Sequence, residues 1–136
     1  MPKFLKDVDL KGKVALVTGA TKGIGRSTAI AMHQVGANIV AIGRNKNDLK
    51  SLKKKLKTRI QCIECDVNNY DKISKAINKL KKIDILVNNA GTNLPEPFLK
   101  VKKTSLETLL KVNTMAAFNV ARLCTDKMLK HKNRRK

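Results

Sequence analysis

The chain has 136 residues and carries 30 lysine and arginine residues against 10 acidic ones, a formal net charge of +20 at neutral pH. Hydrophobic residues make up 42% of it, which is enough for a buried core and excludes a largely disordered chain. No apolar run reaches the roughly 18 residues that a membrane-spanning helix needs, and residues 1–13 hold no apolar block of signal-peptide length. We therefore predict one cytoplasmic domain over 1–136, without a membrane segment.

The basic field would attract anions, including phosphorylated ligands and nucleic acid. Aromatic side chains that could stack on bases are scarce, with three Phe, one Tyr and no Trp. We interpret the charge as a lysine-rich solvated surface and regard nucleic acid as an unfavoured partner. A basic nucleic-acid-binding fragment stays an alternative, with residues 130–136 (KHKNRRK) as a candidate patch, although a frayed helix end explains that segment more simply.

Strand-like and helix-like stretches alternate along the first half of the chain. The β-branched apolar run at 13–19 predicts a first strand, and 38–43 predicts a second. A helix between them has an apolar face at helical spacing and ends at Gly36. A second helix follows, with lysines around its exposed side. The apolar positions of the two helices are Thr28, Ala31, Met32 and Val35, and then Leu49, Leu52 and Leu56.

The second half continues the alternation. We predict strands over 59–67 and 82–91, separated by a helix whose apolar face is Ile73, Ala76, Ile77 and Leu80. A loop punctuated by two prolines leads into a long helix. That helix is predicted to start near Thr104, with Glu107 completing a capping box, and to run to about Lys130.

This order predicts an α/β fold, a Rossmann-like doubly wound parallel sheet with helices on both faces. The long helix is apolar or small on nearly every side over 112–124, whereas a helix covering one sheet face needs a single apolar stripe. We expect a second contact there, which is either the core of a larger domain or another subunit. The helix around 106–130 is thus a candidate surface for a homo- or hetero-oligomer.

A Cys-x-x-Cys pair lies within the third predicted strand. Residues three apart on a strand face opposite sides, so the Cys62 and Cys65 thiols should diverge. No second cysteine pair exists, and His33 and His131 have no ligand spacing. We interpret Cys62, Cys65 and Cys124 as structural thiols and predict no metal site.

Three glycines, Gly19, Gly23 and Gly25, lie between the first strand and the first helix. Glycine permits the tight turn and lets the backbone approach a pyrophosphate, while the helix start offers free N–H groups. We therefore predict dinucleotide binding. An NAD-specific site would place an acid at the end of the second strand, but residues 39–46 contain none. Arg44 there, with Lys22 in the glycine loop, favours NADP(H).

The loop TGATKGIG, which begins at Thr18, resembles that of the short-chain dehydrogenase/reductase family. Three further landmarks agree in order, which are Asp66-Val67, the NNAG at 88–91 and Asn113. The resemblance spans residues 10–130, and within the family the chain looks most like the L-xylulose (dicarbonyl) reductase group.

The resemblance implies roles by position. Gly19, Gly23, Ile24 and Gly25 would line the pyrophosphate, and Thr18 belongs to the same loop. Asp66 and Val67 would contact adenine, and Asn89, Ala90 and Gly91 would flank the cofactor ribose. Asn88 would tie the central strands together, and Asn113 is the one family catalytic position present.

The resemblance also implies NADPH-dependent reduction of ketones, dicarbonyls or L-xylulose by a Tyr proton donor, a Lys four residues later and a Ser. The single tyrosine, Tyr70, is followed four residues on by Ser74, and its position suggests packing or surface exposure. We therefore expect a chain truncated after the long helix, which keeps the cofactor-binding half and is inactive alone. A carbonyl substrate is expected only with the missing C-terminal part. The alternative is a catalytically inactive partner of a full-length reductase.

Overall fold

A computed structural model of the chain describes residues 7–133 and contains one parallel sheet. Its strands are β1 (Val14–Thr18), β2 (Asn38–Gly43), β3 (Ile60–Glu64) and β4 (Ile85–Val87), in the order β3-β2-β1-β4. Leu16 in β1 lies beside Val40 on one side and Leu86 on the other. The sheet reverses its strand order at β1, where the chain crosses from β3 back to β4. These features confirm the predicted doubly wound α/β fold.

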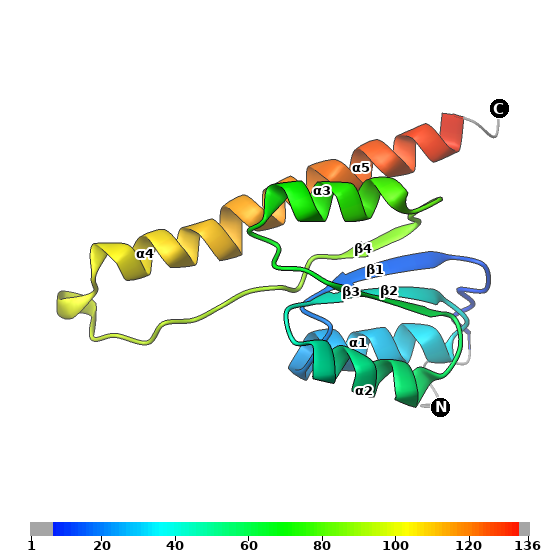
Figure 1. Cartoon of the computed structure of the whole chain (residues 1–136), viewed down its shortest axis with the longest axis horizontal. Helices are drawn as coiled ribbons and strands as arrows, with labels where there is room; N and C mark the ends of the chain where they lie inside the picture. Colours follow the sequence, from blue (N-terminus) through cyan, green and yellow to red (C-terminus); the bar gives the residue numbers. More distant parts are fainter. Residues whose placement is uncertain (1–6, 134–136) are drawn as a thin grey trace.

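Helices cover both faces of the sheet (Figure 1). Helices α1 (Gly23–Gln34) and α2 (Lys46–Leu56) lie on one face, and α3 (Tyr70–Lys79) and α5 (Ala117–Asn133) lie on the other. Helix α4 (Lys103–Leu110) projects beyond the sheet, preceded by the short turn η2 (Phe98–Lys100) and joined to α5 by a π-helical segment, η3 (Lys111–Ala116).

The sheet divides the core into two apolar layers because successive strand residues point to opposite faces. Ala15 and Val17 of β1 pack with the apolar faces of α1 and α2, and Leu16 packs on the side of α3 and α5. The predicted helix positions Leu49, Leu52 and Leu56 are buried in the first layer. Ile73, Ile77 and Leu80 are buried in the second, together with Val120 and Cys124 of α5.

Local signals set several helix ends. Asn45 and Asn69 cap α2 and α3, and each side chain accepts a hydrogen bond from the backbone N–H three residues on, at 3.0 Å. Gly36, with φ of 106°, lies just past the end of α1 and donates its N–H to the His33 carbonyl, as predicted for a C-terminal glycine.

Strand β2 has its predicted bounds, whereas the other three strands are shorter than predicted. Strand β3 ends at Glu64 rather than 67 because the chain turns there, with the Asp66 carboxylate accepting the Asn68 N–H at 2.9 Å. Strand β4 covers Ile85–Val87 rather than 82–91. The predicted site residues at these strand ends therefore lie in turns.

The predicted capping box is wrong. Helix α4 begins at Lys103, its N-cap is Lys102, and no side chain caps it. Thr104 is already inside the helix, where its carbonyl accepts a hydrogen bond from the Thr108 hydroxyl at 2.8 Å. The long helix is also interrupted by η3, which apolar periodicity does not reveal.

Cys62 and Cys65 face opposite sides of the sheet, as predicted, with Cys62 packed against the α1–α2 layer and Cys65 in the α3–α5 layer. All three thiols are free, and burial raises the pKa of each. The pKa of Cys124, which is fully buried, rises to about 11. Residues 7–133 hold no cluster of three or more His, Cys, Asp or Glu that could bind a metal.

Within the described range, no helix is both long and apolar enough to cross a membrane. Residues 1–6 of the N-terminal segment considered as a signal peptide, and residues 134–136 of the basic segment, lie outside the described residues.

Asp84 joins the starts of β4 and β1. Its carboxylate accepts the Val14 N–H at 2.7 Å and lies 3.0 Å from the Lys82 ammonium, which also donates to the Gly12 carbonyl. Burial alone would raise the pKa of Asp84, but the hydrogen bond from Val14 and the charges of Lys82 and Lys13 hold it below its usual value. The charged form of Asp84 therefore stabilises the fold.

We predict that Asp84→Asn lowers the free energy of unfolding at pH 7 by roughly 0.5–1 kcal/mol, since the ion pair is partly solvent-exposed. Because the folded-state pKa is lowered, the contribution is present above the unfolded pKa, near 3.8, and is lost as pH falls through the folded pKa. Urea denaturation at pH 7 and at pH 3 measures this. Equal differences between the two proteins at both pH values would contradict the prediction.

Candidate cofactor-binding site

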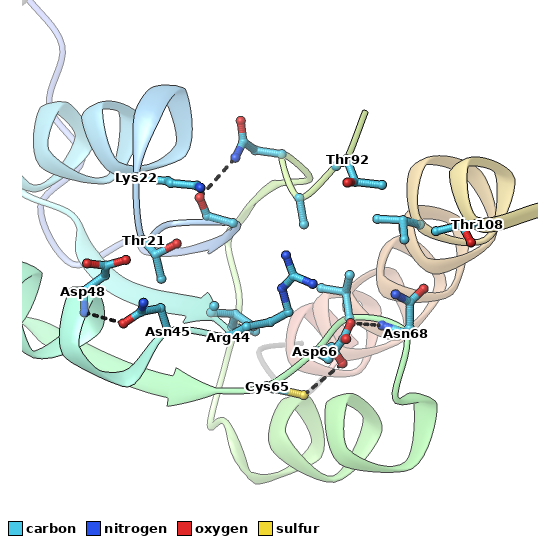
Figure 2. Close-up of a pocket in the computed structure, with 18 residues that line it drawn as sticks. Thr21, Lys22, Arg44, Asn45, Asp48, Cys65, Asp66, Asn68, Thr92 and Thr108 are labelled. Carbon is cyan, nitrogen blue, oxygen red and sulfur yellow. Dashed lines mark hydrogen bonds between the residues drawn. The ribbon is translucent and has the colours of Figure 1, made fainter. Parts of the chain in front are cut away.

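A cavity of about 770 Å³ lies at the carboxyl ends of the strands. Figure 2 shows it enclosed by the segments that follow β1, β2 and β3, by Thr92 after β4, and by Thr108 on α4. Open parallel sheets bind ligands at this edge, where the strand order reverses. Eight predicted site residues line the cavity, namely Gly19, Lys22, Arg44, Asp66, Val67, Asn89, Ala90 and Gly91.

The glycine loop packs too tightly for side chains at two positions. A Cβ atom added at Gly25 would lie 2.4 Å from the Gly19 carbonyl oxygen and 2.4 Å from the Asn89 amide nitrogen. Gly19 adopts φ of 65°, a conformation that L side chains rarely take. Gly23, with φ of 56°, starts α1 with open space around it, and Ile24 is 79% exposed. Gly23, Ile24 and Gly25 border the loop without lining the cavity.

The start of α1 is electropositive. Lys22 occupies its N-cap position, no side chain caps the helix, and the first turn holds no acidic residue. The backbone N–H groups of that turn are therefore left for an anion, which the helix dipole also favours.

A buried hydroxyl fixes the segment after β4 to the glycine loop. Thr18 is fully buried, and its Oγ1 accepts the N–H groups of Asn89 and Ala90, both at 3.0 Å. The Asn89 amide in turn donates to the carbonyls of Thr18, at 3.1 Å, and Gly19, at 3.3 Å. Thr18 thus lies behind the cavity and supports two of its walls.

Asn88 is predicted to tie the central strands together, but its side chain binds a helix instead. Its amide donates to the Ala117 carbonyl at 2.7 Å, so it ties the end of β4 to the first residue of α5. The neighbouring Asn89 joins β4 to β1, because only Asn89 points toward the glycine loop.

Two exposed cations reach the cavity from neighbouring segments, Lys22 from the glycine loop and Arg44 from the end of β2. Figure 2 shows the Arg44 side chain extending into the space between the segments. Gly43 lets the two segments approach, since a Cβ added there would lie 2.3 Å from the Thr21 methyl carbon. Asp48 in the first turn of α2 also lines this side.

Beyond β3, the turn presents Asp66 and Val67 to the cavity. One carboxylate oxygen of Asp66 accepts the Asn68 N–H, and the Asp66 carbonyl accepts the Asn69 N–H at 2.9 Å. The side-chain oxygen of Asn68 is buried without a hydrogen-bond partner among residues 7–133. Asn68 lines the cavity, but this oxygen is buried rather than exposed to it.

Asn113 lies at the centre of η3 and holds the loop after β4. Its side chain accepts the Thr92 N–H at 2.8 Å and donates to the Thr92 carbonyl at 2.9 Å. The cavity is lined there by Thr92 and Val112, while Asn113 lies behind them. π-helical turns of this kind occur frequently at functional sites.

Sequence reasoning missed several lining residues, which are Thr21, Asn45, Asp48, Asn68, Thr92, Thr108 and Val112. Most of them follow a predicted strand end, so the rule that ligands bind at the carboxyl edge could have found them. Tyr70 lies outside the cavity at the start of α3, where its hydroxyl accepts a hydrogen bond from Arg122 at 3.2 Å.

We predict that Thr18→Val destabilises the chain by about 1–3 kcal/mol, because the Asn89 and Ala90 N–H groups lose their acceptor in a buried place. Thr18→Ser is the matched control, since it keeps the hydroxyl and removes only a methyl group. Chemical denaturation of the three proteins makes the comparison. A valine variant at least as stable as the serine variant would contradict this role.

Comparisons with known proteins agree with this geometry. The family model described as short chain dehydrogenase matches residues 13–135. The chain is 37% identical to L-xylulose reductase of Mus musculus over 123 residues, which are 90% of this chain and 50% of that protein. It is 34% identical to the 3-oxoacyl-[acyl-carrier-protein] reductase FabG of Rickettsia felis over 125 residues, 92% of this chain and 52% of that protein.

The crystal structure of a Sinorhizobium meliloti 1021 protein, described as a short-chain alcohol dehydrogenase, superposes with a TM-score of 0.79 at 32% identity. The matched region covers 88% of this chain and 50% of the Sinorhizobium meliloti chain. The chain spans about half the length of the relatives it matches. The family match, the sheet order and the glycine loop place the chain in the short-chain dehydrogenase family of oxidoreductases.

Proposed function

We propose that this chain binds NADP(H) in the cavity at the carboxyl edge of the sheet. The observation that carries the proposal is the pair of exposed cations, Lys22 and Arg44, that line one side of it. A guanidinium matches phosphate geometry, and an ammonium adds a point charge, so together they suit a ribose 2′-phosphate. The one acid on that side, Asp48, lies on α2 rather than at the strand end, where an NAD-specific acid would bind the ribose.

The remaining walls suit the other parts of a dinucleotide. Gly19 and the uncapped start of α1 would hold the pyrophosphate. Asp66 and Val67 would contact the adenine, and Asn89, Ala90 and Gly91 would contact the ribose. The cavity of about 770 Å³ is large enough for a ligand of this class. When bound, the nicotinamide supplies or accepts a hydride.

We further propose that these 136 residues bind the cofactor without reducing a carbonyl. A carbonyl reduction needs a proton donor, and no tyrosine lines the cavity. The one tyrosine of the sequence, Tyr70, lies outside the cavity and has Ser74 rather than lysine four residues on. The Tyr70 hydroxyl is hydrogen-bonded to Arg122 away from the cavity, so it is not positioned to protonate a substrate bound there. We expect reduction of ketones, dicarbonyls or L-xylulose only where the matching half of a reductase is also present, and we place this binding in the cytoplasm.

We predict that the chain binds NADPH at least about tenfold more tightly than NADH, as expected for a charge-assisted contact to the 2′-phosphate. Isothermal titration measures both dissociation constants. Lys22→Ala and Arg44→Ala should each weaken NADPH binding while leaving NADH binding within about twofold. Lys54→Ala is the matched control, since it removes an exposed cation of α2 that lies outside the cavity.

Equal binding of the two cofactors would contradict the choice of NADP(H). In the same samples, adding diacetyl together with NADPH should cause no loss of the absorbance of the reduced nicotinamide, which would report oxidation of NADPH. A steady, protein-dependent loss would contradict the proposed inactivity.

A second candidate function is association with another subunit. Large apolar side chains stay exposed along α4, η3 and α5 and recur about once per turn, with Leu106, Leu110, Met115 and Phe118 each at least half exposed. Side chains at this spacing form a stripe suited to a partner helix. The partner would be a second copy of the chain or a full-length reductase.

If this surface mediates association, the chain should sediment as a concentration-dependent dimer, and Phe118→Glu should yield monomers because a carboxylate would be buried in the contact. Val8→Glu is the control, because Val8 is an exposed apolar residue far from this helix in sequence. Sedimentation velocity over a range of concentrations makes the test. A wild-type chain that stays monomeric, or a dimer that survives Phe118→Glu, would contradict the self-association.

A further inference from the structure

We propose that Arg26 is a positioning residue that sets the preference of the site for a 2′-phosphorylated cofactor. It holds the glycine loop and the start of α2 at the spacing at which Lys22 and Arg44 act on the same phosphate. The inference deepens the proposed function and rests on it.

Arg26 makes contacts with two elements at once. From the first turn of α1, its Nη1 donates to the Thr21 carbonyl at 3.4 Å and to the Asp48 carbonyl at 3.1 Å. Its Nη2 donates to the Ser51 hydroxyl at 3.0 Å. Thr21 belongs to the glycine loop, and Asp48 and Ser51 belong to α2. One guanidinium therefore joins the two segments across the space between α1 and α2.

One of these contacts ends next to Lys22, and another is connected to the neighbour of Arg44 through a second hydrogen bond. Thr21 directly precedes Lys22, so the bond to its carbonyl fixes the backbone from which the Lys22 side chain starts. On the other side, the Asp48 N–H donates to the Asn45 side chain at 3.0 Å, and Asn45 directly follows Arg44. The positions of Lys22 and Arg44 are thus linked through Arg26.

Other contacts join the glycine loop to the end of β2. The Thr21 methyl group packs on Gly43, where a Cβ would lie only 2.3 Å away. The Ala20 N–H also donates to the Ile42 carbonyl at 3.1 Å. Arg26 adds directional bonds from the loop to α2, beyond the strand end, so that α2 as well as β2 is held to the loop.

The planar fork of arginine is what this arrangement uses. A lysine ammonium carries the same charge on a single nitrogen and cannot reach three acceptors on two elements together. Arg26 is half-buried and does not line the cavity, so it acts on the ligand only through the segments it holds.

The loss of Arg26 should affect one part of the ligand selectively. The Gly19 end of the glycine loop and the ribose wall are held by a separate network around Thr18 and Asn89, which Arg26 does not touch. A loosened contact between the glycine loop and α2 would therefore weaken the grip on the 2′-phosphate while leaving the rest of the dinucleotide site in place.

The test compares NADPH with NADH, and 2′,5′-ADP with 5′-AMP, by isothermal titration with the whole chain. For Arg26→Gln we expect the dissociation constant of the 2′-phosphorylated ligands to rise about tenfold and that of the others to change by less than about twofold. Arg26→Lys, which keeps the charge, should lose most of the preference as well. Ser51→Ala, which removes one of the three bonds, should lower the preference by about twofold to threefold.

Lys50→Gln is the matched control, because it removes an equal charge from an exposed position on α2, the helix that Arg26 contacts, and should leave the preference unchanged. Thermal melts establish that each variant is folded. Ser51→Ala decides the matter if the Arg26 variants do not fold, and an unchanged preference in that variant would overturn the inference.

Each remaining outcome is also decisive. An unchanged preference in Arg26→Gln, a retained preference in Arg26→Lys, or equal weakening of all four ligands would overturn the positioning role. An equal loss in Lys50→Gln would show that net charge alone sets the preference. If the wild-type chain itself shows no preference, the proposed NADP(H) site fails together with this inference, whereas a wild-type preference that survives in the variants overturns the inference alone.

Discussion

The site depends on one buried hydroxyl. Thr18 closes β1 and accepts two N–H groups from the segment after β4, so β1 and its neighbour β4 end in a shared hydrogen-bond network. Gly19 and Gly25 leave the space in which the Asn89 amide completes that network, because a Cβ at either position would overlap it. Without these contacts the end of β4, which pairs with β1 over only three residues, would have little to hold it. The cavity walls are therefore positioned by polar contacts beneath them.

Much of the fold follows from the sequence because its signals are local. Leu49, Leu52 and Leu56 are buried as their spacing predicts, and Gly36 lies just past the end of α1. The strand-to-helix position of the glycines likewise gives the location of the cavity. What local patterns miss is set by contacts between distant segments. Strand β3 ends early because of a side-chain turn at Asp66, and Thr104 lies inside α4 instead of capping it. The π-helical segment around Asn113 accompanies a clamp on Thr92, 21 residues earlier in the chain.

The same distinction applies within the site. Residues whose backbone must adopt an unusual conformation, such as Gly19, can be identified from the sequence, because that conformation favours glycine. Residues that act through side chains reaching across the fold do not, since Arg26 looks like any other of the 30 cations until its three acceptors are seen. Asn88 and Asn89 make the same point, because adjacent residues of one type turn to different partners. The sequence pattern identifies the segment that contributes to the site, whereas only the folded structure shows which partner each side chain contacts.

The chain combines a strongly basic surface with an arm whose tip carries Phe98 and Leu99, exposed by 90% and 94%. Figure 1 shows that this arm, with α4 behind it, stands clear of the sheet and its helices. Two copies approaching through their arms would meet the mutual repulsion of +20 charges before the apolar tips could touch. That repulsion extends about 30 Å at 0.01 M salt and only about 10 Å at 0.1 M. We therefore expect electrostatic repulsion to keep copies of this protein apart at low ionic strength. At higher ionic strength, counterions screen the lysine charges, and the exposed apolar side chains at the end of the arm can come into contact.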